Sequence, residues 1–390
     1  MSSYGETPTA DVRAFPGIRY HLARAGDLSV LVSPPYDVIP EPELERYRSL
    51  SPYNVIRLIR PGTDYEGAAA TFEEWTRNGI LEPDPPSMYV HEVAFGGRRR
   101  RDLIAALRLQ PYEDRVVLPH ERTHRGPKED RLALLRATNV SFEPLWFTYE
   151  GRGAGVSNIL DDITAGVPAV VFDGPEGTKH RLWTVSEPAL HAAVHAAMSD
   201  LPLLIADGHH RYETTLAHSL EVGGDADAAS RFTLALLTDL DDPGLDVLPT
   251  HRVLKAGVAV TGGEDMPSLE ATLSALPGRV AAGTYREHHF QLLELEGEMA
   301  LVELHRQVID NILGKRNPED FLIYTRDAAE AVRWVDEGVG AAAFFLPPPD
   351  LRQVLKLAQE GKTFPQKSTY FHPKPPSGMV FHRLDPDRRL

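Results

Sequence analysis

The chain has 390 residues, of which 42% are hydrophobic and 25% charged, the composition of a globular protein with a sizeable core. It contains no cysteine, which excludes thiol nucleophiles, disulfides and cysteine-ligated zinc or iron–sulfur sites. A net charge of −15 disfavours a nonspecific nucleic-acid surface, because acidic side chains repel phosphate. No apolar segment approaches the length of a membrane span and no secretion signal is visible, so we expect a cytoplasmic protein.

The first predicted lobe covers residues 1–150 and combines strands with helices. Its expected elements follow apolar periodicity and turn residues. They are strands at 28–32, 54–59, 88–95, 103–109 and 141–149, and helices at 65–78 and from 130 to 137. The pair Gly96-Gly97 predicts a hairpin between two of these strands, with the arginine run Arg98 to Arg101 at its solvated tip.

Glycines at 151–155 predict the start of a central lobe, residues 151–254, and a third lobe covers residues 255–390. Strands and helices alternate along both. The expected strands are 169–173, 181–185, 201–206, 231–238, 290–295, 321–325 and 341–346, and the expected helices are 156–165, 187–199, 212–220, 268–275, 303–313, 328–337 and 350–360. This alternation predicts an α/β fold in which mixed sheets are flanked by helices, with two or three lobes around one polar cleft.

The segment from Asp207 to Arg211, Asp-Gly-His-His-Arg, lies between a predicted strand and a predicted helix. Gly208 permits a left-handed turn and close approach of a ligand. The amide groups at a helix start favour an anion, most often a phosphate, and Arg211 can bind one bidentately. His209 or His210 can act as a general acid or base near neutral pH. The alternative interpretation is a structural turn in which the histidines cap or pack.

A second motif, His120-Glu121-Arg122-Thr123-His124, matches the zinc-protease pattern H-E-x-x-H. That site needs a continuous helix, whereas Pro119 and Gly126-Pro127 restrict this motif to a short window. The following residues, 128–131, begin a helix with charged side chains. Among them, Lys128 and Arg131 are candidate phosphate ligands, although the same charges would also suit a salt-bridged helix start.

Three further polar segments are candidates. Residues 367–369, Lys-Ser-Thr, resemble the end of a P-loop but lack its upstream glycines, so we expect either phosphate contact or a surface loop. His251 and Arg252 form a short polar insertion between apolar segments. The Pro34-Pro35 turn presents Tyr36 and Asp37 rigidly, either as a base or metal ligand or as a structural corner.

Together these motifs resemble one bacterial and archaeal family, domain of unknown function 1015. Six segments carry the resemblance in order, across nearly the whole chain. They are residues 33–39, 54–58, 120–123 with 127–131, 206–212, 248–252 and 365–370. His124 is not part of the family pattern, which further weakens the zinc-protease interpretation.

The central turn also resembles, more distantly, the phosphate-binding turn of the ParB/sulfiredoxin superfamily, where a glycine–x–x–arginine turn opens a helix beneath nucleotide phosphates. That superfamily includes CTP-hydrolysing partition proteins, sulfiredoxins and free-serine kinases. His209 occupies the position of the sulfiredoxin cysteine, so sulfinic-acid reduction is excluded. The acidic charge and the lack of a DNA-binding segment disfavour a partition role. The resemblance therefore implies a ParB/sulfiredoxin-like core with kinase-like chemistry.

We therefore predict a nucleotide-dependent phosphoryl-transfer enzyme, kinase-like or a phosphohydrolase, that acts on a small metabolite. We expect Mg²⁺ with ATP, ADP or CTP, and no nucleic-acid or membrane partner. The predicted catalytic residues are His209, His210, Asp207, Glu213 and Asp37. The predicted phosphate or nucleotide ligands are Gly208, Arg211, Lys128, Arg131, Lys367, Ser368, Thr369, His251 and Arg252. The predicted metal ligands are Asp37, Glu213 and His120.

Two alternatives stay open. One is a metal-dependent hydrolase built on His209, His210, His120 and an acidic residue. The other is a noncatalytic nucleotide-binding or sensing protein.

Overall fold

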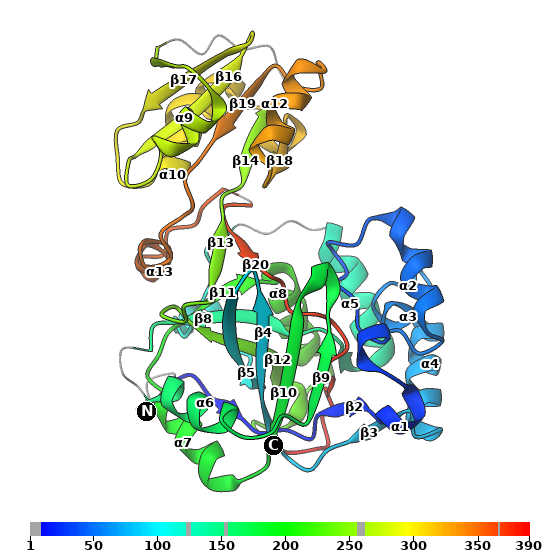
Figure 1. Ribbon diagram of the computed structural model, residues 1–390. Helices are drawn as coiled ribbons and strands as arrows, with labels where there is room; N and C mark the ends of the chain where they lie inside the picture. The colour runs from blue at the N-terminus through cyan, green and yellow to red at the C-terminus, as the bar shows by residue number, and fades with distance from the viewer. Residues whose placement is uncertain (1–8, 122–125, 152–154, 256–261, 366) are drawn as a thin grey trace. The chain divides into compact units, whose positions relative to one another are not determined.

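The chain forms two compact units in a computed structural model that describes residues 9–121, 126–151, 155–255, 262–365 and 367–390 (Figure 1). The first unit comprises Met1–Pro119, Thr123–Leu245 and Pro373–Leu390. The second comprises His120–Arg122 and Asp246–His372. Each unit has its own central sheet and hydrophobic core. The predicted α/β class, mixed sheets flanked by helices, is confirmed.

The first unit is built on a nine-stranded mixed sheet with the order β6-β11-β8-β12-β5-β4-β10-β9, in which β1 also pairs with β5. Its strands are β1 (Val12–Arg13), β4 (Met88–Phe95), β5 (Arg98–Arg108), β6 (Val117–Leu118), β8 (Leu145–Tyr149), β9 (Val170–Asp173), β10 (Lys179–Val185), β11 (Leu203–Asp207) and β12 (Phe232–Asp239). Two small ribbons complete its strands: β2 (Ile18–Tyr20) with β3 (Leu81–Pro83), and β7 (Val140–Ser141) with β21 (His382–Arg383). Buried apolar side chains of the central strands form the core.

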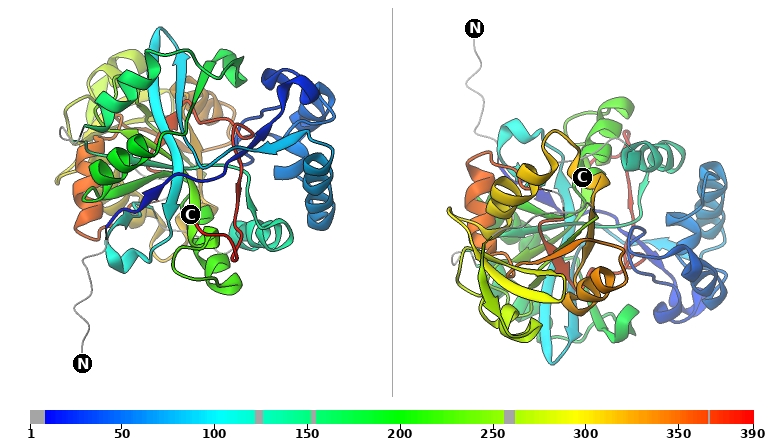
Figure 2. Two further views of the ribbon diagram at one scale, coloured as in Figure 1. Left: turned by 90° about the horizontal axis from the view of Figure 1, so that it is seen from below. Right: turned by 90° about the horizontal axis from the view of Figure 1, so that it is seen from above.

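Helices surround this sheet. Two of them, α6 and α7, add Val156, Leu160, Val194 and Met198 to the core. The helices are α1 (Leu22–Ala25), α2 (Leu44–Leu50), α3 (Ile56–Ile59), α4 (Tyr65–Arg77), α5 (Gly126–Thr138), α6 (Val156–Thr164), α7 (Pro188–Met198) and α8 (His209–Val222). Figure 2 shows α2, α3 and α4, in blue, grouped beside the strands of the first unit.

The second unit contains a six-stranded antiparallel sheet with the order β15-β17-β16-β19-β14-β18, and a two-stranded ribbon. Its strands are β13 (Asp246–Leu248), β14 (His251–Leu254), β15 (Glu264–Met266), β16 (Ala281–Arg286), β17 (His289–Glu294), β18 (Leu322–Thr325), β19 (Ala342–Phe345) and β20 (Tyr370–His372). Its helices are α9 (Leu269–Ser274), α10 (Ala300–Leu304), α11 (Asp310–Leu313), α12 (Ala328–Asp336) and α13 (Leu351–Gln359), with a π-helical turn at His305–Ile309. No helix among the described residues is long and apolar enough to cross a membrane.

Two expected strands near the N-terminus are wrong. Residues 28–30 form a 3₁₀ helix, and Ile56–Ile59 form α3. The Asn54 side chain accepts a hydrogen bond from the Ile56 amide at 3.0 Å and donates to the carbonyls of Val30 and Val32. This local capping overrides the alternating pattern, because Asn side chains satisfy turn and helix-start backbone groups.

The arginine run is also placed differently from its expected position. The hairpin at Gly96-Gly97 is confirmed, and both glycines have positive φ, 51° and 77°. However, β5 begins at Arg98, so the run belongs to a strand, and Arg100 is fully buried. A buried aspartate two residues later, Asp102, pairs with it at 2.8 Å.

The two units do not follow the predicted boundaries at 150 and 254. Strand β8, expected in the first lobe, lies between β11 and β12 in one sheet, with Leu145 opposite Ala235 and Thr148 opposite Leu204. Residues from either side of 150 therefore share one core. The C-terminal residues return to the first unit, where β21 pairs with β7.

Candidate functional site

The Asp-Gly-His-His-Arg segment forms the expected strand, turn and helix. Strand β11 ends at Asp207, and α8 begins at His209. Gly208 between them has φ 100°, a left-handed conformation that favours glycine. A Cβ at this position would lie 2.9 Å from the Leu145 side chain, so the turn is also sterically restricted to glycine. With no side chain at the N-cap, the first-turn amides of α8 receive no cap from residue 208.

Asp207 is the centre of an ion-pair cluster in the first unit. It accepts a 2.6 Å contact from Arg211 and a 2.5 Å contact from Lys374. Lys374 also lies 3.3 Å from Asp37, so one ammonium group bridges two carboxylates. Burial raises the pKa of Asp207, but the charges of Lys374 and Arg211 outweigh it and lower the pKa to about 2. Asp207 is therefore ionised at neutral pH.

Glu143 joins the Pro-Pro-Tyr-Asp turn to this cluster. Its Oε1 accepts hydrogen bonds from the Tyr36 amide at 2.9 Å and the Ser377 hydroxyl at 2.8 Å. Arg211 donates to the carbonyl of the next residue, Pro144, at 3.1 Å. The negative charges of Glu143, Asp207 and Asp37 raise the pKa of Arg211 against the lowering effect of burial. The rigid turn therefore presents Asp37 beside Arg211 and Lys374.

The helix-start residues 128–131 flank the same cluster. The Arg131 guanidinium stacks on the Tyr36 ring at 4.2 Å and donates to Asp130 at 2.8 Å. Burial raises the pKa of Tyr36 to about 12, so its phenol stays neutral. Lys128 is paired with Glu213, which is also 3.4 Å from the Tyr112 hydroxyl.

The two histidines of the turn differ in burial. His209 is buried, whereas His210 is half-buried. A general acid or base must come within hydrogen-bond reach of the ligand's reacting proton, directly or through one water. His210 is therefore the better placed of the two for the predicted acid–base role.

The remaining predicted residues form a second group, in the second unit. His120 Nε2 lies 2.9 Å from the Thr369 hydroxyl, and Glu121 Oε1 accepts from the Ser368 amide at 2.7 Å. Arg252 Nη2 donates to the Lys367 carbonyl at 3.1 Å. The Lys-Ser-Thr segment thus contacts the first two residues of the H-E-x-x-H motif, whose residues 122–124 lie outside the described part of the chain.

The predicted metal ligands are divided between the units. Asp37 and Glu213 belong to the first unit and His120 to the second, and each of the two carboxylates contacts a lysine. In the described parts of the chain, no group of three or more His, Asp or Glu side chains is arranged to hold a metal ion.

Two cluster residues were missing from the prediction, Glu143 and Lys374. Glu143 lies in the apolar run Phe142-Glu143-Pro144-Leu145, where an acid in a buried strand start is itself a signal for a partner. Lys374 lies between Pro373 and Pro375, a context that restricts the backbone but does not indicate its partner.

Two buried histidines, His251 and His305, make the stability of the second unit sensitive to acid. Burial and the Arg252 charge lower the pKa of His251 from 6.5 to about 4 and that of His305 to about 3. Unfolded chains take up these protons near pH 6.5, so stability falls as the pH drops from 6.5 towards 4. We expect a loss of about 1.4 kcal/mol per pH unit for each histidine. Urea unfolding across this range should show the slope.

The variant His305→Gln removes one of the two titrations and should flatten the slope. The exposed His289→Gln is the matched control and should leave it unchanged. Equal slopes in the wild type and in His305→Gln would contradict the assignment.

The fold and the ordered motifs define an α/β protein of mixed sheets. The sequence pattern of domain of unknown function 1015, a family described as proteins of unknown function, matches residues 12–338, and the chain belongs to that family. No curated protein matches the sequence. The more distant resemblance to the ParB/sulfiredoxin superfamily stays a prediction.

Three of the solved structures that are partly similar to this chain are as follows. A free serine kinase in complex with AMP has 17% identity and a TM-score of 0.34, covering 66% of this chain and 83% of its own. A conserved hypothetical protein from Pyrococcus furiosus has 16% identity and a TM-score of 0.36, covering 69% and 92%. C-terminally truncated SbnI from Staphylococcus aureus has 12% identity and a TM-score of 0.38, covering 69% and 82%.

Proposed function

We propose that the protein binds the phosphate groups of a nucleotide at the start of α8 and transfers a phosphoryl group to or from a small metabolite. One observation carries the proposal. Three segments far apart in sequence bring Asp37, Asp207 with Arg211, and Lys374 together at the left-handed turn that opens α8. Four charged side chains beside a helix start without a side-chain cap favour the binding of a charged ligand there.

The turn has the features that phosphate binding requires. Gly208 removes the side chain that would hinder a ligand, and the helix dipole favours negative charge. Arg211 and Lys374 supply two cations, and charge neutralisation is the main catalytic need in phosphoryl transfer. Their present partner, Asp207, would then share them with the ligand.

The two aspartates suit a divalent cation. Asp37 and Asp207 already hold one positive charge between them, the Lys374 ammonium, and carboxylate oxygens are the ligands that Mg²⁺ prefers. Asp37 and Asp207 would hold the ion, and bound Mg²⁺ would neutralise phosphate charge. His210 would exchange the proton of the acceptor hydroxyl. Asp207 cannot serve as a general acid near neutral pH, because its pKa is about 2.

Nucleotide binding is the first test. Melting of the full chain with ATP, ADP and CTP, with and without Mg²⁺, should show a rise in Tm with at least one nucleotide. Arg211→Ala should weaken that binding about 10- to 100-fold, the loss expected for one or two charge-assisted hydrogen bonds. The control is Arg136→Ala, since Arg136 forms an exposed pair with Glu221 in the same unit. Full affinity in Arg211→Ala would end the phosphate-turn proposal.

Turnover distinguishes catalysis from sensing. Loss of the bound nucleotide's terminal phosphate, measured by phosphate release or transfer, supports an enzyme, whereas tight binding without turnover supports the noncatalytic alternative. No observation favours the metal-dependent hydrolase, because no group of three or more His, Asp or Glu side chains among the described residues is arranged to hold a metal ion.

A further inference from the structure

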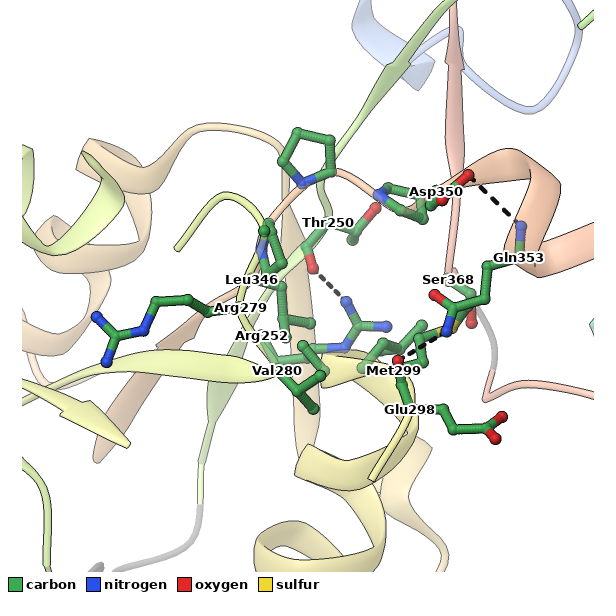
Figure 3. Close-up of a pocket in the computed structure, with 16 residues that line it drawn as sticks. Thr250, Arg252, Arg279, Val280, Glu298, Met299, Leu346, Asp350, Gln353 and Ser368 are labelled. Atoms are coloured by element: carbon green, nitrogen blue, oxygen red, sulfur yellow. Dashed lines mark hydrogen bonds between the residues drawn. The ribbon is translucent and has the colours of Figure 1, made fainter. Parts of the chain in front are cut away.

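The second unit contains a cavity of about 240 Å³ that the proposed phosphoryl transfer at α8 does not use (Figure 3). Its lining includes the polar residues Thr250, Arg252 and Ser368 and the apolar residues Met299 and Leu346. A pocket with a few placed polar groups against an apolar wall is the usual form of a small-molecule site.

Arg252 is the unusual group in this lining. The residue is fully buried, and in the described part of the chain its guanidinium contacts neutral groups: the Thr250 carbonyl, the Lys367 carbonyl at 3.1 Å and the Tyr324 ring at 5.6 Å. Its Nε has no hydrogen-bond partner among the residues that the structure describes. Among the described residues, no Asp or Glu oxygen lies within 4.0 Å of it.

Three other arginines whose side chains are at most 11% exposed provide an internal comparison. Arg100, Arg131 and Arg211 contact aspartates at 2.8, 2.6 and 2.6 Å. A buried charge without a counterion costs several kcal/mol, so folded proteins normally supply one. Arg252 is buried at least as deeply as these three, yet the described residues supply no direct counterion.

The nearest acid does not replace that counterion. Glu121 interacts with Arg252 only at longer range, and its carboxylate binds the Ser368 amide. Burial raises the pKa of Glu121, which favours its neutral form, and burial lowers the pKa of Arg252 to about 10. A raised pKa of a buried carboxyl group and a lowered pKa of a buried guanidinium are both expected when no opposite charge is close.

We propose that this cavity binds the carboxylate of a small, partly apolar organic acid, with the anion next to Arg252 and the apolar body against Met299 and Leu346. An anion there would supply the missing counterion, and Coulomb attraction is stronger in a water-poor interior than in solvent. Ser368 adds a further polar residue to the lining. The site lies within the second unit and is independent of the α8 turn.

Size and charge favour a monocarboxylate. The cavity is smaller than the roughly 300–1,000 Å³ of sites for drug-sized ligands, so a nucleotide would not fit. The lining also contains Glu298 and Asp350. These acids would oppose a doubly charged phosphate ester more than a single carboxylate.

The methyl group of Met299 reports on this cavity directly. The full chain, labelled at methionine methyl carbons, is titrated with butyrate, succinate and inorganic phosphate, and the Met299 resonance is assigned through Met299→Leu. Butyrate should shift that resonance saturably, with weaker effects from succinate and phosphate. Met266, in the same unit but not in the cavity lining, should not move.

Arg252→Gln should weaken butyrate binding at least about tenfold, the equivalent of roughly 1.4 kcal/mol. The exposed Arg316→Gln is the matched control. If Arg252→Gln does not fold, as judged by the methionine spectrum, Ser368→Ala replaces it and should weaken binding about three- to tenfold. No saturable shift with butyrate, tighter binding of phosphate, or unchanged affinity in these variants would overturn the proposal.

Discussion

Asp102→Ala is expected to lower the free energy of unfolding by about 3–5 kcal/mol, because it removes one partner of a fully buried ion pair. The Asp102 carboxylate accepts from Arg100 at 2.8 Å, from His91 Nδ1 at 2.8 Å and from the Thr238 hydroxyl at 2.5 Å. Both members of the Arg100–Asp102 pair are 0% exposed. The variant would leave a buried guanidinium without its carboxylate.

Urea unfolding at neutral pH measures this loss, and one exposed pair gives the control. Asp173 and Lys179 lie 3.7 Å apart on neighbouring strands with 74% and 76% of their side chains exposed. Asp173→Ala should therefore cost less than about 1 kcal/mol. A loss below that value in Asp102→Ala would show that water or another group replaces the carboxylate.

The same network reaches the candidate site. Arg100 donates to the Pro373 carbonyl at 2.9 Å, and the next residue is Lys374. The Arg100 guanidinium also stacks on Trp146 at 4.2 Å. The buried sheet network therefore fixes the backbone from which Lys374 extends to Asp207 and Asp37.

Periodic segments of the fold could be predicted from sequence, and short ones could not. The helix at 65–77 and the strand, turn and helix around Gly208 were expected and are observed. The helix at 56–59 was not expected, because the apolar residues of segment 54–59 suit either a strand or a helix. One side chain, Asn54, decides between them by accepting a hydrogen bond from the Ile56 amide. Strand order cannot be deduced from local patterns either, so the sequence does not show that β8 lies between β11 and β12.

The part of the candidate site whose residues are close in sequence could be predicted. Gly208 and Arg211 belong to one turn, and their proposed roles follow because the amide groups at a helix start favour an anion. Glu143 and Lys374 could not be assigned, because their hydrogen-bond and ion-pair partners are 107 and more residues away along the chain. The described contacts place the predicted site residues in two groups, one in each unit, and each group has its own buried arginine, Arg131 or Arg252.

Lys374→Met is expected to lower the free energy of unfolding by about 2–3 kcal/mol at neutral pH, less than for a fully buried pair. Arg211 would remain to pair with Asp207, and Asp37 is 43% exposed and can be hydrated. The two aspartates, however, would face each other without the bridging ammonium. Lys179→Met, from the exposed pair with Asp173, is the matched control.

Lowering the pH should reduce the difference in the free energy of unfolding between Lys374→Met and the wild type. Lys374 is the strongest of the charges that lower the pKa of Asp207 from 3.8 to about 2. The stabilisation from this ionised aspartate is complete above pH 3.8 and is lost as the pH falls towards 2. Below that range the carboxyl is neutral in both proteins, and the ammonium has less to stabilise. The two free energies of unfolding, measured in urea from neutral to acidic pH, should therefore converge, and a difference that stays constant would mean that Lys374 stabilises through packing of its alkyl chain.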